Sequence, residues 1–418
     1  MRGRDLLSHG GTKSEAPCLC KSTGKGSVSL GALSGLKILD FSTLLPGPYA
    51  TLMLADLGAE VLKVSSRDRY DLVTHWPPVI EGTDTTAAAA WLGRNKKSIY
   101  LNLKKPEAVE TVKKLIMEYD IIVEQFRPGV MKKLGLDYET LRRINPRLIY
   151  CSLTGYGQTG PMRDRAGHDI NYMSRSGVMA SAGRKSTGPV LTNMQIADVA
   201  VGSMNSVVGI LAAVYYREQT GKGQHIDIAM MDGMVPFHSM DGACFLAGAA
   251  MPERESQMLN GGEIYDFYET SDGEYMSAGA LEPKFFAALC EGLGYPQWAD
   301  GKILQEDLPA VKETFRSVFK TKTRKEWTEV FSQLDACVEP VLTLKEASED
   351  AQIAARGMLP QVSLPQAPER TVCQLGCPVR LSECPAEYRH AGYPEGWHTE
   401  EVLEKLGYSK EEIEHELN

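Results

Sequence analysis

A histidine and an aspartate stand side by side at His168 and Asp169, between a glycine-rich loop at residues 155–160 and an apolar segment. Histidine can take up and release a proton near neutral pH, and a carboxylate can serve as a base or a nucleophile. Such pairs are also common in surface loops. The pair therefore predicts proton-transfer or covalent chemistry only if other reactive groups meet it in space.

Two further carboxylates stand at expected helix starts. Asp198 precedes a long segment rich in small apolar residues, 199–217, and Glu282 directly precedes Pro283. A carboxylate at a helix start can accept hydrogen bonds from free backbone N–H groups and is favoured by the helix dipole. From the sequence alone, capping is the simpler interpretation of both residues.

The elements that must position these groups alternate between strands and helices. Buried strands are expected at 36–40, 59–64, 98–103, 120–125 and 148–153, with helices at 49–57 and 106–119 between them. This alternation predicts an α/β fold, in which a parallel sheet carries helices on its faces. Ligands bind such sheets beyond the carboxyl ends of the strands, so the loops at 42–48, 65–70, 126–129 and 154–168 are the candidate binding loops.

The loop at 155–160 matches the pattern G-x-G-x-x-G, but its position argues against a dinucleotide site. The dinucleotide fingerprint belongs to the first strand–helix turn and opens a helix. Here the loop follows a late strand and leads into further loop. We therefore expect the glycines to let the backbone approach a different ligand.

Basic residues gather near the same loops, in an otherwise acidic chain. They are Arg67 and Arg69, then Arg94, Lys96 and Lys97, then Arg127. Several cations at one end of a sheet favour a phosphate-bearing ligand, although any one of them can simply be a solvated surface charge.

Composition narrows the class of protein. The 418 residues are 43% hydrophobic and 24% charged, with a net charge of -9. This acidity argues against general nucleic-acid binding, and the longest apolar run, 207–216, is shorter than the roughly 20 residues of a membrane span. Nine scattered cysteines fit free thiols in the cytoplasm, and the spacing of Cys373, Cys377 and Cys384 is not that of a zinc site, so no metal is expected.

Several motifs resemble those of the class III (CaiB/BaiF-type) CoA-transferase family. They are LSGL at 33–36, LPGPYA at 45–50, ADLGAEV at 55–61, RPG at 127–129, YGQTGP at 156–161 and TGKGQ at 220–224. Within the family, the chain is most similar to α-methylacyl-CoA racemases. The motifs are AGHDINY at 166–172, AD at 197–198, NGG at 260–262, GALEPKF at 279–285, DACV at 335–338, PVL at 340–342 and HTEE at 398–401.

The resemblance implies a reaction and a role for each reactive residue. Inverting the carbon α to a thioester needs an acid/base group on each face of the substrate. The resemblance gives these roles to His168 and Asp198, with Glu282 orienting the imidazole. It leaves the backbone N–H near Asp169 to stabilise the enolate oxygen. No cofactor is implied beyond the CoA of the acyl-CoA substrate, whose contacts would come from the residues of the loops: Arg67, Arg94, Lys96, Lys97, Phe126, Arg127, Tyr156 and Gly157.

The family also implies an architecture that periodicity does not show. It implies a large Rossmann-like domain at 32–225, a linker and small α+β domain at 226–335, and a segment at 336–418 that returns to the large domain. The Ser-, Gly- and Lys-rich composition of 1–31 itself predicts a disordered extension. The resemblance implies an interlocked homodimer, in which Glu282 reaches the active site of the partner subunit.

One alternative reaction stays open. In a CoA-transferase, Asp169 would be the nucleophile that forms an acyl anhydride and then a CoA thioester. Glu263-Ile264 also stands where racemases have a small residue and proline, so the identity of the acyl chain is left open. The resemblance favours the racemase.

Overall fold

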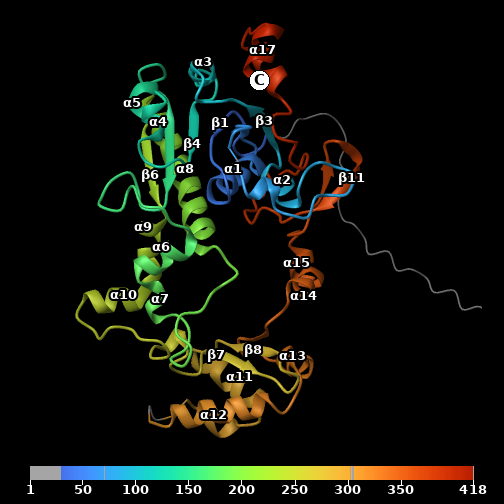
Figure 1. The fold of residues 1–418 in the computed structure, drawn as a ribbon. Helices are drawn as coiled ribbons and strands as arrows, with labels where there is room; N and C mark the ends of the chain where they lie inside the picture. The colour runs from blue at the N-terminus through green and yellow to red at the C-terminus, as the bar shows by residue number, and fades with distance from the viewer. Residues whose placement is uncertain (1–29, 70, 302, 304–305, 418) are drawn as a thin grey trace, which may run out of the picture.

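The computed structural model describes residues 30–417 except 70, 302, 304 and 305. Most of the expected N-terminal extension, residues 1–29, lies outside the described residues. Figure 1 shows two folded parts, a larger one around a sheet and a smaller one below it.

Six parallel strands form the central sheet in the order β3-β2-β1-β4-β5-β6. They are β1 (Lys37–Asp40), β2 (Glu60–Ser65), β3 (Lys96–Tyr100), β4 (Ile121–Glu124), β5 (Ile149–Thr154) and β6 (His225–Ala229). The sheet confirms the expected α/β fold. Because strand order reverses between β1 and β4, a crevice is expected at their carboxyl ends. Strand β6 spans the expected domain boundary at residue 225, so the large-domain sheet continues to Ala229.

Helices cover both faces of the sheet because its strands alternate apolar side chains between two cores. In β1, Leu39 faces the core that includes Leu62 and Val112, while Ile38 faces the core that includes Val61 and Ile210. The helices of this domain are α1 (Pro46–Asp56), η1 (Val73–His75), α2 (Ala87–Leu92), α3 (Pro106–Leu115), α4 (Val130–Lys133), α5 (Tyr138–Leu141), α6 (Asp169–Ser176), α7 (Val178–Ser181), η2 (Ile196–Ser203) and α8 (Met204–Thr220). Helix α3 ends four residues before the expected end, and Tyr119 packs into the core beyond it.

The longest helical stretch among the described residues, Ile196–Thr220, combines the π-helical segment η2 with α8. By length and composition it could cross a membrane, although 44% of its apolar window is buried inside the fold. It packs against α1 and β5, as a core helix of an α/β domain does.

The smaller part has its own antiparallel sheet, in the order β7-β8-β9. Its strands are β7 (Asp266–Glu269), β8 (Tyr275–Ala278) and β9 (Val338–Pro340), and its helices are α11 (Pro283–Leu293), η5 (Pro296–Trp298), α12 (Leu308–Phe319) and α13 (Arg324–Phe331). Aromatic side chains fill its core, including Tyr268, Phe315, Phe319 and Trp327. Residues 230–265 connect the two parts and contain α9 (Met230–Met234), η3 (Val235–His238), α10 (Ser239–Leu246) and η4 (Met258–Asn260).

After β9 the chain returns to the large domain (Figure 1). This return contains α14 (Leu344–Glu349), α15 (Ala351–Ala355), β10 (Gln361–Leu364), β11 (Ala367–Cys373), α16 (Thr399–Lys405) and α17 (Lys410–Leu417). His398 and Thr399 accept hydrogen bonds from the backbone N–H groups of Ser98 and Tyr100 at 3.1 and 3.0 Å. The return therefore satisfies backbone groups of the edge strand β3, which would otherwise be open to pairing with another chain.

Candidate active site

A cavity of about 440 Å³ lies where the strand order reverses. Its walls come from the loops after β1, β4 and β5 and from the segments that carry His168 and Asp198. Its lining includes Leu44, Pro46, Gln125, Phe126, Arg127, Tyr156, Gly167, His168, Asn171, Tyr172, Asp198 and Met230. The position is the ligand crevice that a sheet of this order provides.

His168 is held at the N-terminal end of α6. Its backbone is extended, and its N–H donates to Oδ1 of Asn171 at 3.0 Å, while Asp169 begins the helix. The His168 carbonyl accepts the N–H groups of Asn171 and Tyr172, whereas the N–H groups of Asp169 and Ile170 come too early for a bond within the helix, and the helix dipole favours negative charge near them. The helix start can therefore stabilise an anion that forms beside His168.

The glycines of the neighbouring loop make room for Tyr172. A Cβ added at Gly155 would lie 2.3 Å from the Tyr172 ring, and one at Gly167 would lie 2.6 Å from it. The Tyr172 hydroxyl donates to the Gly167 carbonyl. The sequence predicts that the glycines of 155–160 admit a ligand. At Gly155 the space is instead filled by the Tyr172 side chain, which supports the loop before His168.

Asp169 and Asp198 are joined through the backbone. The backbone N–H of Asp198 donates to Oδ1 of Asp169 at 3.0 Å. The N-cap of η2 is Gln195, and Asp198 lies in its first turn. The sequence predicts that the Asp198 carboxylate accepts free N–H groups at this helix start. Here the Asp169 carboxylate accepts one of them, and the Asp198 side chain lines the cavity. A π-helical segment at such a position is common at functional sites.

The two carboxyl groups differ in environment. Burial, reinforced by the charge of Asp169, raises the pKa of Asp198 to about 6, against a smaller opposing effect of His168. Burial also raises the pKa of Asp169, but hydrogen bonds from the backbone of Asp198 and Ala197 oppose that rise. A carboxyl group with a pKa near 6 can act both as acid and as base close to neutral pH.

Cationic side chains border the cavity. Arg127 is exposed and lines it, and Arg163 and Arg165 line it as well. Arg163 and Arg165 are not among the residues predicted for the site from the sequence. The two arginines stand two residues apart in the loop that leads to His168, and this spacing could have identified them as candidates for the site. Tyr156 packs edge-on against Tyr172 at 5.2 Å between ring centroids. Gly157 adopts φ 82°, a conformation that favours glycine.

A second cavity, of about 320 Å³, shares Phe126 with the first. The Arg69 guanidinium lies 4.5 Å from the centre of the Phe126 ring and donates to the Thr43 hydroxyl at 2.9 Å. Arg67 lies over the Tyr100 ring at 5.1 Å. These groups form an aromatic and cationic surface beyond the carboxyl ends of β2 and β3.

Two expected ligand contacts have their charges paired in the interior. Arg94, 1% exposed, binds Asp56 at 2.6 Å. Lys96, 3% exposed, lies 3.4 Å from Asp40 and donates to the Pro48 carbonyl at 2.8 Å. Burial lowers the pKa of Lys96 to about 8, although Asp40 opposes this. Both side chains stabilise the large domain. The third lysine expected there, Lys97, pairs with Glu401 at 3.0 Å on the surface.

Glu282 lies in the other domain. It is the exposed N-cap residue of α11, and it is not among the residues that line the His168 cavity within the described chain. The single chain therefore brings together His168, Asp169, Asp198 and Arg127 but not Glu282. Within the described residues, no cluster of three or more His, Cys, Asp or Glu side chains could hold a metal ion.

The model of CoA-transferase family III matches residues 33–399, so the chain belongs to this family. It is 38% identical to an α-methylacyl-CoA racemase of Homo sapiens, covering 93% of this chain and 96% of the relative. It is 33% identical to a succinate–glutarate CoA-transferase of Agrobacterium fabrum, covering 90% and 95%. The crystal structure of a CaiB/BaiF family protein from Brucella suis matches it with a TM-score of 0.78 at 30% identity, covering 90% and 99%.

Proposed function

We propose that the protein is a racemase of 2-methylacyl-CoA thioesters, acting by proton removal and return at the α-carbon. The observation that carries this proposal is that His168 and Asp198 line one cavity, while Asp169 accepts the backbone N–H of Asp198. Two acid/base groups are what an inversion through an enolate requires. Its racemase and transferase relatives have acyl-CoA chemistry in common, which supports an acyl-CoA substrate.

Each group has a defined task in this reaction. His168 removes or returns the proton on one face of the α-carbon, and Asp198 does so on the other. The enolate oxygen lies against the backbone N–H of Asp169 at the start of α6, where the helix dipole favours negative charge. Arg127, with the arginines and aromatic rings of the neighbouring loops, binds the phosphates and adenine of CoA. The reaction uses no further cofactor.

The protein acts as a homodimer in this proposal, with Glu282 of one chain hydrogen-bonded to His168 of the other. The exposed position of Glu282 at the end of the small domain suits such a contact. The described cysteines are all free thiols, which fits the reducing cytoplasm.

The alternative is CoA transfer with Asp169 as the nucleophile. The similarity to CoA-transferases and the position of Asp169 beside the cavity favour it. In that reaction the Asp169 carboxylate must attack the thioester carbonyl, whereas in the structure its Oδ1 accepts the N–H of Asp198. This engagement favours the racemase.

The test is incubation with a 2-methylacyl-CoA in heavy water without an acceptor acid. We expect α-deuterium uptake by the wild type. His168→Ala and Asp198→Asn should each slow exchange ~10²–10⁴-fold, with opposite bias between the two enantiomers, because each group serves one face. Asp169→Asn keeps the shape and an acceptor for the Asp198 N–H, so it should retain substantial exchange.

The transferase predicts a different outcome for the same samples. Exchange of CoA would then require an added acid and would disappear in Asp169→Asn. Trapping of a covalent adduct at Asp169 with hydroxylamine during turnover, together with the lack of α-deuterium uptake, would overturn the racemase proposal.

A further inference from the structure

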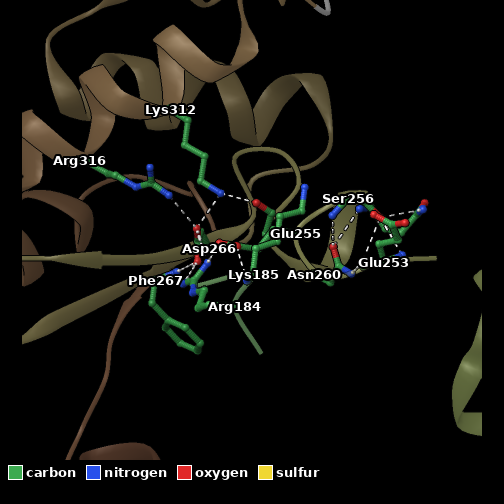
Figure 2. A network of polar contacts seen from close by, with 12 residues as sticks. Arg184, Lys185, Glu253, Glu255, Ser256, Asn260, Asp266, Phe267, Lys312 and Arg316 are labelled. Atoms are coloured by element: carbon green, nitrogen blue, oxygen red, sulfur yellow. Dashed lines mark hydrogen bonds and ion pairs between the residues drawn. The ribbon is translucent and has the colours of Figure 1, made fainter. Parts of the chain in front are cut away.

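Away from the proposed active site, three cations surround one buried carboxylate. Asp266 in β7 has a side chain that is 3% exposed. Lys312 Nζ lies 2.6 Å from Asp266 Oδ2, Arg184 Nη1 lies 3.0 Å from it, and Arg316 Nη2 lies 3.6 Å from it. Figure 2 shows these side chains converging on Asp266 from different segments. The cluster joins parts of the chain that are distant in sequence.

Arg184 extends the cluster to a second carboxylate. Its Nη1 lies 3.1 Å from Glu255 Oε1, and the other oxygen of Glu255 accepts the backbone N–H of Lys185 at 2.8 Å (Figure 2). Arg184 thus bridges the connecting segment at Glu255 and the small domain at Asp266. An arginine suits this position because its guanidinium presents several donors in a fixed plane.

On one side, the cluster holds the segment between the two proposed acid/base groups. Arg184 lies in the loop between α7 and η2, so it follows the helix that His168 caps and precedes Asp198. The same loop is held by Arg254, whose Nε donates to the Ala182 carbonyl at 2.9 Å. The loop therefore has a fixed attachment to the connecting segment and to the small domain.

On the other side, the cluster holds the strand that leads to Glu282. Asp266 is the β-ladder partner of Ala278 at the end of β8, and Glu282 follows four residues later. Lys312 also donates to the Gly261 carbonyl, which fixes the chain just before β7. A shift of Asp266 would carry the start of α11, and Glu282 with it.

Asp266 stays ionised at neutral pH, so its ion pairs with Arg184 and Lys312 stay formed. Burial by itself would raise the pKa of Asp266, but hydrogen bonds from Arg184 and Lys312 hold it below its usual value. Removing Asp266 would leave the buried Lys312 without its carboxylate partner, which is strongly destabilising. Removing Arg184, which is 37% exposed, leaves the Asp266–Lys312 pair in place. Arg184 is therefore the member whose loss loosens the attachment without dismantling the small domain.

We propose that the Arg184–Asp266 ion pair is a tether that positions the small domain relative to the segment carrying His168 and Asp198. Arg184 and Asp266 act in this proposal as positioning residues, through the segments that they join. That a shift of the small domain would displace Glu282 from a His168 imidazole rests on the proposed function. The tether itself does not, since a family member that transfers CoA would need its domains held in the same way.

The experiment compares Arg184→Gln with Arg184→Lys and the wild type in the full-length protein. Misplacement of a catalytic group by about 1 Å can cost ~10²-fold, so Arg184→Gln should lower kcat by ~10- to 100-fold while KM changes little. Arg184→Lys, which can still pair with Asp266, should recover most of the loss. Backbone hydrogen exchange should become faster at residues 182–188 and 253–262 in Arg184→Gln only.

Lys320→Gln is the matched control. Lys320 pairs with Glu269 at 2.9 Å, so it also joins the end of α12 to β7, but on the surface and without a link to residues 182–188. Its substitution should leave kcat and hydrogen exchange as in the wild type. A wild-type kcat in Arg184→Gln, or an equal loss in Lys320→Gln, would overturn the tether.

The assay also separates the tether from the proposed function. Turnover is followed both as α-deuterium uptake and as CoA transfer to an added acid. If the wild type only transfers CoA and Arg184→Gln slows that transfer, the tether stands while the racemase proposal fails. If deuterium uptake is present but equal in both proteins, the racemase stands while the tether fails.

Discussion

Single residues of the candidate site owe their chemistry to a few local contacts. Asp198 and Asp169 are the same residue type, yet only Asp169 accepts the backbone N–H of the other. Asp198 is left with burial and a neighbouring negative charge, which raise its pKa to about 6. The sequence could show the types and order of these residues. It could not show that Asp169, rather than Asp198, accepts at the start of η2, because that depends on how two distant helix starts meet.

The environment of Asp198 predicts a pH dependence. Proton removal by Asp198 needs the carboxylate, so exchange from the enantiomer that it deprotonates should fall as pH is lowered through about 6. Asp169→Asn removes a negative charge that raises this pKa, so the midpoint should move to lower pH. Deuterium uptake measured from pH 5 to 8 with each enantiomer checks both statements. An unchanged midpoint in Asp169→Asn would contradict the coupling.

The same shift has a consequence for stability. A carboxyl group whose pKa is raised in the folded protein binds its proton more tightly there than in the unfolded chain. The contribution of Asp198 is therefore fully present below the pKa of the unfolded chain and is lost as pH rises through about 6. Keeping Asp198 ionised for catalysis thus costs stability.

At the scale of helices and strands, alternation and turn residues predicted the parallel sheet and the loops that form the cavity. The expectation that Arg94 and Lys96 contact a ligand did not foresee that both side chains are buried and paired with carboxylates. Strand β3 begins at Lys96, so the backbone of Arg94 and Lys96 lies at its amino end. Arg94 pairs there with Asp56, whereas the Lys96 side chain extends to Asp40, the last residue of β1, and both pairs lie in the interior. The sequence alone does not show at which end of a strand a neighbouring charged residue lies unless the first residue of the strand is known.

This difference predicts opposite behaviour for two arginines. Arg127→Ala should raise KM for the full acyl-CoA more than for a substrate truncated at pantetheine, because only the former carries the nucleotide phosphates. Arg94→Ala should not raise KM for one of the two substrates more than for the other. It should instead lower the free energy of unfolding by about 3–5 kcal/mol, since it leaves Asp56 buried without its partner. Steady-state kinetics with both substrates and thermal unfolding separate these results. An equal KM effect on both substrates in Arg127→Ala would mean that Arg127 does not contact the nucleotide.

For the whole molecule, the described chain leaves both Glu282 and several large apolar side chains uncovered. Val208 and Tyr215 of α8 are 65% and 70% exposed, and Leu246 of α10 is 86% exposed. Contiguous exposed apolar surface is typical of interfaces with other molecules. A second copy of the chain fits the proposed homodimer, since it would cover these residues and bring its small domain to the His168 cavity. Periodicity could not show this, because pairing between chains leaves no repeat in the sequence.

A shared site predicts complementation between two inactive variants. In a heterodimer of His168→Ala and Glu282→Gln chains, one site would carry both changes and the other would carry neither, because each site takes His168 and Glu282 from different chains. Random reassociation of equal amounts gives half heterodimers, each with one intact site, so activity should recover to about a quarter of the wild type. Deuterium uptake after mixed refolding or co-expression measures this. Each variant refolded alone is the control, and if Glu282 served the cavity of its own chain, every site would carry one substitution and mixing would recover nothing.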